Sequence, residues 1–450
     1  MLPLNCLPPR RLGLHYFPDT LHYREVDMQA WLPVLQELCA GWLVLRAEPS
    51  RAIPEHFIRG LKKAGIEPVI QFKLPLGRQN DVRELNPLLE VYADWGARYV
   101  LLFDRPNARE SWSASGWVQQ DLVERFLDRY LPAATAAQKA GLLPVFPALE
   151  PGGSYWDTAF LLSALQAMQR RKQDALLQNL VLSAYAWAGE PSRTLDWGSG
   201  GPERWPQARP YHTPEGSQDQ RGFRIFDWYL AIAGSVLAQP CSIMLLQAGQ
   251  PSDPCRDLCP AQEENVLNIA RLLEGETVMN PLEQGNVLDS ISPQVVACNF
   301  WLLSAGAESP HAGQAWYPAA AFAANAANAA EKPALVRRLA LWQRERVVTE
   351  AAGGVPVSGA THPIRHYLLL PGAEWGVSDW YLEVIRPFVK KHKPTVGFSV
   401  EEAGKAARVT VVGGMQHYPE DLLERLQKAG SRVEQITGDG TNIASQLAER

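Results

Sequence analysis

The amino-acid sequence predicts an α/β protein in which a (β/α)8 barrel of the TIM type is followed by a small C-terminal α/β module. The first observation behind the barrel is a rhythm. Over the first ~345 residues a short apolar segment of β type is followed by an amphipathic helical segment, eight times in succession. The second observation is that each apolar segment ends in a polar, aromatic tip. Such alternation is typical of a closed parallel barrel ringed by helices.

The strands and helices of the barrel follow from the apolar period in each segment. The predicted strands are residues 12–17, 42–47, 67–72, 99–104, 143–149, 180–186, 242–247 and 295–303. Apolar residues at i, i+3, i+4 and i+7 predict helices, for example over residues 28–38, 54–63, 122–140, 158–169, 223–237 and 261–273, and the eighth helix is predicted around residues 333–346. Residues 188–221, rich in Gly, Pro, Trp and Arg, are expected to form a long functional loop over the barrel mouth. Residues 319–331, almost all Ala and Asn, read as a surface insertion.

The chain changes character after the predicted eighth helix. We assign residues 1–350 to the barrel and the Gly- and Pro-rich residues 351–363 to a linker. Residues 364–450 form the small module, with strands predicted over 366–370, 408–412 and 432–436. Helices are predicted there over 380–389 and 419–429 and after the last strand.

Composition excludes several classes of protein. The chain has 450 residues, 46% of them hydrophobic and 20% charged, with a formal net charge of −5. No apolar run is long enough to span a membrane, so we expect no membrane insertion. No basic block is present, so nucleic acid is not an expected partner. Residues 1–11 lack the apolar core of a signal peptide, which favours a cytoplasmic location.

The six cysteines are too sparse for a disulfide scaffold. Cys255 and Cys259 form one close pair, which is either a pair of thiols in a Pro-rich loop or half of a metal site. No second pair or His-x-His lies nearby, so we expect no metal and no cofactor. The sequence carries no prediction of oligomeric state.

Chemistry in this fold sits where the strands end, and the tips here carry carboxylates, amides and aromatic rings. Such a mixture suits a carbohydrate, because flat rings stack on sugar C–H faces while amides and carboxylates bind hydroxyls. The substrate-binding candidates at the tips are His15, Lys73, Asn107, Trp112, Trp156, Tyr185, Trp187, Glu190, Gln247 and Trp301. Arg46 and Gln71 also end strands. An oligo- or polysaccharide is therefore the expected partner.

Three carboxylates are candidates for acid/base chemistry. Glu150 ends an apolar strand and enters a Pro-Gly-Gly turn, where it is expected to be partly shielded from water, as a general acid requires. Asp104 and Glu110 follow the fourth strand and could stand opposite it. Each also has a structural reading: Glu150 as a helix-capping or Arg-paired residue, Asp104 as a partner of Arg105 or Lys73, and Glu110 as a solvated charge.

Residues 10–346 resemble the large clan of glycoside hydrolases built on (β/α)8 barrels. The likeness lies in Asn107-Ala-Arg-Glu110 after the fourth strand and in Trp301 at the end of the eighth. The resemblance implies an acid/base Glu directly after an Asn on strand four, a nucleophilic Glu on strand seven, and a sugar-stacking Trp on strand eight. The sequence departs from this pattern: two residues separate Asn107 from Glu110, and strand seven ends in Gln247 or Gln250.

The C-terminal residues are similar in pattern to one cell-wall-binding repeat of Gram-positive surface proteins. The likeness lies in Val409-Thr-Val-Val-Gly-Gly, the helix from Leu422, the strand from Val433 with Gly438-Asp-Gly, and the helix from Ile443. This resemblance implies a cell-surface location, against the cytoplasmic one favoured above. A single α/β module with glycine turns is the alternative.

Two functions are consistent with the sequence. In the first, the barrel is a glycoside hydrolase that uses Glu150 with Asp104 or Glu110. In the second, suggested by Gln247, the barrel has lost catalysis and presents its aromatic mouth to a glycan or a partner protein. The separation of the mouth carboxylates discriminates between them.

Overall fold

A computed structural model describes residues 10–77, 82–188, 193–249, 260–280, 287–317, 333–351, 364–371, 379–392, 394–414, 418, 420–428, 430–438 and 440–448. The chain divides into two compact units. One contains Met1–Glu274 and Val278–Gly354, and the other contains Val355–Arg450 with the short segment Gly275–Thr277. The predicted linker, the Ala- and Asn-rich segment 319–331 and the Cys255–Cys259 pair lie almost wholly or wholly outside the described residues.

The first unit is a closed barrel of eight parallel strands, as the sequence predicts. The strands are β1 (Leu12–His15), β2 (Trp42–Arg46), β3 (Glu67–Gln71), β4 (Tyr99–Leu101), β5 (Leu143–Val145), β6 (Val181–Tyr185), β7 (Ser242–Ala248) and β10 (Val295–Phe300). The barrel closes where Leu12, Gly13 and Leu14 pair with Cys298, Asn299 and Phe300.

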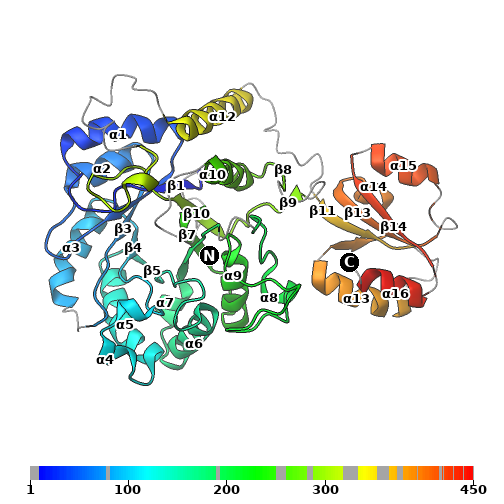
Figure 1. Cartoon of the computed structure of the whole chain (residues 1–450), viewed down its shortest axis with the longest axis horizontal. Helices are drawn as coiled ribbons and strands as arrows, with labels where there is room; N and C mark the ends of the chain where they lie inside the picture. Colours follow the sequence, from blue (N-terminus) through cyan, green and yellow to red (C-terminus); the bar gives the residue numbers. More distant parts are fainter. Residues whose placement is uncertain are drawn as a thin grey trace. The chain divides into compact units, whose positions relative to one another are not determined.

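Helices surround this barrel (Figure 1). The main ones are α1 (Glu25–Glu37), α2 (Glu55–Lys63), α3 (Val82–Asp94), α5 (Leu122–Lys139), α6 (Asp157–Arg170), α9 (Ile225–Val236), α10 (Pro260–Leu273) and α12 (Ala334–Ala351). Short elements between them are α4 (Ala114–Trp117), α7 (Asp174–Gln178), α8 (Gly201–Arg204), the 3-10 turns Arg109–Ser111 and Ala312–Gln314, and the pair β8 (Val278–Met279) and β9 (Val287–Leu288). None of the described helices is both long and apolar enough to cross a membrane.

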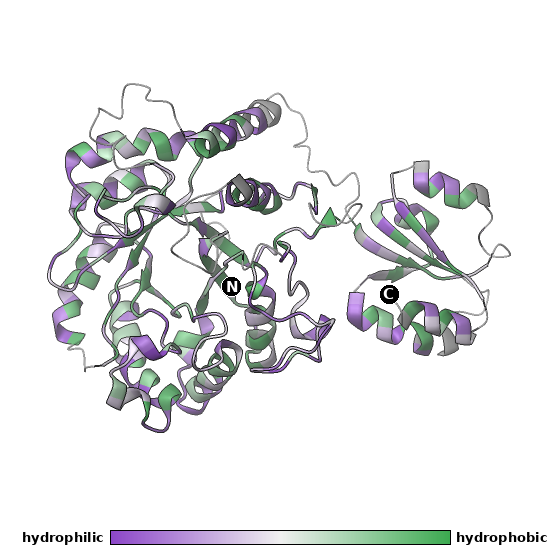
Figure 2. Cartoon of the chain, in the orientation of Figure 1, coloured by the Kyte–Doolittle hydropathy of each residue, from purple (hydrophilic) through white to green (hydrophobic). Residues whose placement is uncertain are grey.

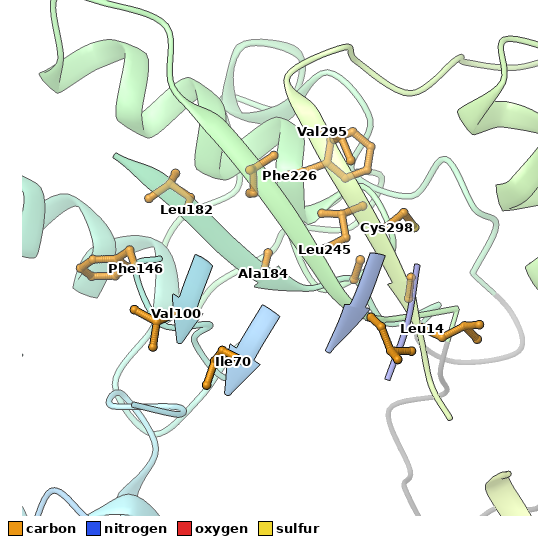
Figure 3. Close-up of a cluster of buried hydrophobic side chains, with 14 of the residues drawn as sticks. Leu14, Ile70, Val100, Phe146, Leu182, Ala184, Phe226, Leu245, Val295 and Cys298 are labelled. Carbon is orange, nitrogen blue, oxygen red and sulfur yellow. The ribbon is translucent and has the colours of Figure 1, made fainter. Parts of the chain in front are cut away.

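Alternation along each strand builds two apolar layers. Outward residues such as Leu14, Ile70 and Leu245 join the large core between strands and helices (Figure 3). Inward residues such as Trp42 and Tyr99 fill the barrel interior. The barrel strands are accordingly mostly green and the helices striped purple and green in Figure 2. The barrel is a packed core, so any ligand must bind at its open end.

The long segment between β6 and α9 is more ordered than a structureless loop. It contains α8, and Arg209 and His212 form a β-bridge. Asp219 organises its second half, because its carboxylate accepts hydrogen bonds from Arg221, Thr213 and Trp197. The sequence did not predict this order, because the residues that bind Asp219 do not recur at a regular spacing along the chain.

The second unit is a doubly wound α/β module. Its strands, β11 (Ile364–Leu369), β12 (Thr395–Gly397), β13 (Ala406–Val412) and β14 (Arg432–Ile436), form a parallel sheet in the order β12-β11-β13-β14. Helices α14 (Val400–Ala403) and α15 (Glu420–Lys428) pack on one apolar cluster. Helices α13 (Asp379–His392) and α16 (Gly440–Ala448) pack on another. Strand β12 is absent from the sequence prediction, because its three residues are too few to show a period.

Candidate functional site

Polar side chains replace apolar ones at the carboxyl end of the barrel interior. Along β2 the residues Trp42 and Val44 point inward, so by alternation Arg46 does too. Arg46 is in register with Gln71 of β3, and residues in register on parallel strands share a face. His15 of β1 and Tyr185 of β6 complete this layer, and both are buried. The barrel mouth therefore has a polar floor.

An alternating chain of cations and carboxylates crosses this mouth. Lys73 Nζ lies 3.0 Å from Asp104 Oδ2, and Arg105 Nε lies 3.7 Å from the same oxygen. Arg105 Nη1 also lies 3.0 Å from Glu150 Oε2. Because Nε and Nη1 of one guanidinium are about 2.3 Å apart, Oδ2 and Oε2 are at most about 9 Å apart. The structure thus brings Asp104 and Glu150 together, with Arg105 between them.

Asp104 is held in its charged form. Burial is the largest single effect and raises the pKa of this carboxyl, but the charges of Lys73 and Arg105 and the hydrogen bond that Tyr185 Oη donates to Oδ1 at 2.5 Å together lower it by more. The net result is a pKa below the usual value. Asp104 is therefore suited to electrostatic work or proton acceptance rather than to proton donation.

Glu150 is positioned by a buried amide rather than by its strand. Its backbone N–H donates to Asn107 Oδ1 at 2.7 Å, while Asn107 Nδ2 donates to the carbonyls of Glu150 and Tyr155, each at 2.9 Å. Asn107 itself is fully buried. All of these hydrogen bonds go to the chain, so the substrate contact predicted for Asn107 is not what its geometry provides. It fixes the turn that carries Glu150.

His15 is a neutral ring buried at the base of the mouth. Burial, with a smaller effect from the charge of Lys73, lowers its pKa to about 3. The backbone N–H of Gln247 donates to His15 Nε2 at 3.2 Å, so the ring accepts there. Gln247 adopts a left-handed backbone conformation with φ of 48°. His15 is a fixed hydrogen-bonding group and not a base at neutral pH.

Two indoles are held at the mouth by hydrogen bonds. Trp187 donates to Gln247 Oε1 at 3.0 Å and stacks on Tyr185 with ring centroids 5.4 Å apart. Trp301 donates to Gln314 Oε1 at 2.8 Å and meets the His15 ring edge-on at 5.1 Å. Both indoles are half-buried, so each retains accessible ring surface. Each ring is therefore oriented before any ligand arrives.

A small pocket opens among these groups. Its lining comprises His15, Phe17, Pro18, Val44, Arg46, Gln71, Lys73, Tyr185, Gln247 and Trp301. The space that water centres can reach is about 20 Å³, which is room for about one water-sized group. A whole sugar ring does not fit inside it, so a sugar would have to lie across the opening.

Three predicted residues lie elsewhere. Glu110 is solvent-exposed in the 3-10 turn Arg109–Ser111 and does not line the pocket. Trp112 is 7% exposed, donates to the carbonyl of Pro106 and carries two arginines near its ring. Trp156 is 6% exposed and is packed by Tyr211 and Arg221. These two indoles are structural in this geometry, because their faces are already covered.

Glu190 lies outside the described residues.

Arg46 and Gln71 line the pocket, yet the sequence analysis assigned them no role. The signal that finds them is period-two alternation, which places both inside the barrel at its last layer. Metal ligands do not converge here: no group of three His, Cys, Asp or Glu side chains in the described part of the chain is placed to hold a metal ion.

No family model matches the chain, and no curated protein matches it. Solved structures with a similar fold include a monomeric β-xylosidase from Caulobacter crescentus CB15, with 13% identity, a TM-score of 0.39, and coverage of 66% of this chain and 60% of that one. A family 51 α-L-arabinofuranosidase from Bifidobacterium longum has 15% identity, a TM-score of 0.29, and coverage of 41% and 46%. A β-galactosidase from Rahnella sp. R3 has 10% identity, a TM-score of 0.32, and coverage of 96% and 71%.

The chain thus spans about three fifths and just under half of the lengths of the first two structures. At these identities and TM-scores the likeness says nothing about activity. The fold assignment stands on the strand pairing of the barrel itself. The resemblance of the C-terminal module to a cell-wall-binding repeat stays a prediction.

Proposed function

We propose that the barrel binds a carbohydrate at the carboxyl ends of its strands and does not cleave it. The half-buried rings of Trp187 and Trp301 supply surfaces on which a sugar can stack. Gln71, Gln247 and Lys73 supply polar groups beside them. This pairing of rings with hydrogen-bonding groups is typical of sites that recognise sugars.

The observation that carries the proposal is the chain of ion pairs from Lys73 to Glu150. Glycoside hydrolysis requires one carboxyl group that is protonated and one that is charged. Here the pKa of Asp104 lies below its usual value, and each carboxylate is already engaged by a cation within 4 Å, Asp104 by Lys73 and Glu150 by Arg105. Arg105 also occupies the space between the carboxylates, where the bond to be cleaved would have to lie.

Strand β7 supports the same conclusion. The side chain of Gln247 accepts from Trp187, and its backbone N–H is bonded to His15. An amide at this position cannot form a covalent ester with a sugar. Gln247 contributes to binding by fixing its neighbours.

Hydrolysis is the second candidate, and one observation favours it. The two carboxylates are at most about 9 Å apart, a limit that is compatible with the separation of about 6.5–9.5 Å in inverting glycosidases. A ligand that displaced Arg105 from Glu150 would free the pair. Incubation of every bound glycan with the intact chain distinguishes the two, because binding without release of product supports the proposal. Cleavage by the intact chain that is abolished in Glu150→Gln would contradict the binding proposal and support glycoside hydrolysis.

The binding itself is tested with a glycan array and titration of the best glycan. Trp301→Ala should weaken binding by roughly twofold to tenfold, because the loss of a stacked ring costs about 0.5–1.5 kcal/mol beyond its area. Trp95→Ala is the matched control, since Trp95 follows α3 at the opposite end of the barrel and is also half-buried. Equal affinity of the wild type, Trp301→Ala and Trp95→Ala for the glycan would show that the glycan binds elsewhere. The absence of binding to any glycan would refute the proposal.

A further inference from the structure

The barrel mouth contains a half-buried cation, Arg46, that lines the pocket and forms no ion pair within the described part of the chain. Arg46 Nη1 is buried and has no hydrogen-bond partner among the residues that the structure describes. No carboxylate of the described part of the chain lies within 4 Å of its guanidinium, unlike the guanidinium of Arg105 or the ammonium of Lys73. Asp104 attracts this guanidinium from farther away, and the donors of Arg46 that Asp104 does not engage remain open to an anion in the pocket.

The groups beside Arg46 can hold the same anion. Gln71 is in register with Arg46 and lines the same pocket. Its amide makes no side-chain hydrogen bond within the described part of the chain. Lys73 lies two residues beyond the end of this strand, has a side chain that is 39% exposed, pairs with Asp104 and also lines the pocket. A guanidinium, an amide and an ammonium thus face one small space.

The charge at the mouth selects a single negative charge. Three cations, Lys73, Arg105 and Arg46, share the two carboxylates Asp104 and Glu150 while His15 is neutral, so the mouth carries one positive charge in excess, although Asp104 also attracts Arg46. Glu48 is exposed on the same strand end, bonds to Thr20, and does not line the pocket. One excess positive charge matches a carboxylate, whose two oxygens fit the planar fork of a guanidinium.

The size of the pocket points the same way. Room for about one water-sized group admits an oxygen of a carboxylate and excludes a sugar ring. Trp301 and Tyr185 border the pocket and lie where the rest of a ligand would continue. A sugar that carries a carboxylate on its ring would insert the carboxylate and leave the ring against the indole.

We propose that the pocket formed by Arg46, Gln71 and Lys73 is a carboxylate subsite, and that the carbohydrate bound by this barrel contains hexuronate units. This inference rests on the proposed binding function and deepens it by naming the class of sugar. Arg46 provides the bidentate contact, Gln71 donates from its amide, and Lys73 adds a third donor.

The test compares two ligands that differ only in charge. Oligomers of galacturonate and the same oligomers after methyl esterification are titrated into the intact chain. The acid form should bind about tenfold to a hundredfold more tightly, the range expected for hydrogen bonds to a charged group. Arg46→Gln should remove this preference, and Arg46→Lys should restore part of it. Arg109→Gln is the matched control, because Arg109 is exposed in a mouth-side turn and does not line the pocket.

Failure of this inference is distinguishable from failure of the proposed function. Equal binding of acid and ester overturns the carboxylate subsite and leaves carbohydrate binding in place. If neither oligomer binds, the melting temperature is measured with free D-glucuronate and with inorganic phosphate. A rise with glucuronate that is lost in Arg46→Gln supports the subsite, whereas no rise, or an equal rise with phosphate, overturns it. Circular dichroism of Arg46→Gln verifies that the variant is folded.

Discussion

At the scale of single residues, the buried carboxylate of Asp157 joins three parts of the mouth-side structure. It is fully buried at the first turn of α6. Its oxygens accept from the backbone of Gly152 at 3.0 Å, from Gln220 at 2.6 Å and from Tyr229 at 2.8 Å. Burial raises its pKa to about 6, although these hydrogen bonds oppose the shift. Asp157 therefore connects the β5 turn, the long loop and α9 through one group.

Asp157 makes stability depend on pH in a defined direction. The pKa is 3.8 in a model peptide and about 6 in the folded chain, so the folded state binds the proton more tightly. Its contribution to the free energy of unfolding is greatest below pH 3.8 and declines as pH rises to about 6. The total decline is about 3 kcal/mol.

Comparison with Asp157→Asn isolates this effect, because the other titrating groups are common to both proteins. The free energy of unfolding of the wild type, minus that of the variant, should fall between pH 4 and pH 6 and then level off. Urea titrations at a series of pH values measure it. A difference that is constant over this range contradicts the assignment.

Much of the candidate site could be placed from sequence. Asp104, Glu150, Tyr185 and Trp301 directly follow or end apolar strands, so their position at the mouth was predictable. Some of their partners were predicted too, because Asp104 was expected to pair with Arg105 or Lys73 and Glu150 with an arginine, and the structure contains these pairs. What the sequence could not show is that one residue, Arg105, contacts both carboxylates, because Asp104 and Glu150 follow different strands. Asn107 shows the same limit: a buried amide that fixes a turn and an exposed one that binds sugar look identical in sequence.

At the scale of elements, the contact between β1 and β10 depends on the absence of one side chain. A Cβ at Gly13 would lie 2.2 Å from Asn299 Oδ1 and 2.7 Å from Trp42 Cβ. Asn299 is fully buried, and its Nδ2 donates to the carbonyl of Leu245 at 2.9 Å. A methyl group would therefore have to displace an asparagine that joins β10 to β7.

Gly13→Ala should lower the free energy of unfolding by about 1–3 kcal/mol or more, because the tightly packed interior cannot accept the added methyl. Gly234→Ala is the matched control. Gly234 is exposed within α9 and has no atom within 4 Å of its added Cβ in the described structure. Its replacement should stabilise the protein by about 0.5–1 kcal/mol. Thermal denaturation measures both, and a harmless Gly13→Ala would contradict the packing argument.

The order and type of the barrel elements could be predicted, while their carboxyl-terminal bounds could not. Residues 143–149 were predicted as one strand, yet β5 ends at Val145. Phe146, Ala148 and Leu149 remain buried, so the apolar run continues beyond the residue at which β5 ends. An apolar run records burial, and burial extends into the loops that cover the core.

At the scale of the whole molecule, the two units have separate cores. The C-terminal module buries Tyr367, Leu369 and Val411 on one face of its sheet and Leu368 and Phe388 on the other. None of these residues belongs to the clusters of the barrel. Each unit has the internal packing needed to unfold on its own.

Calorimetry should therefore resolve two unfolding transitions. Leu369→Ala should destabilise the module by about 2–5 kcal/mol and move only one of them. Leu245→Ala, a fully buried leucine on β7, should move only the other. A single transition that both substitutions shift equally would show that the units unfold as one, and would argue against the domain boundaries predicted from sequence.

Closure of the barrel has a consequence for synthesis on the ribosome. The edge of β1 pairs with β10, nearly three hundred positions later. Until that late segment emerges, the nascent chain exposes an unsatisfied ribbon of backbone amides and carbonyls that can recruit other chains. We therefore expect the incomplete chain to be more prone to aggregate than the closed barrel.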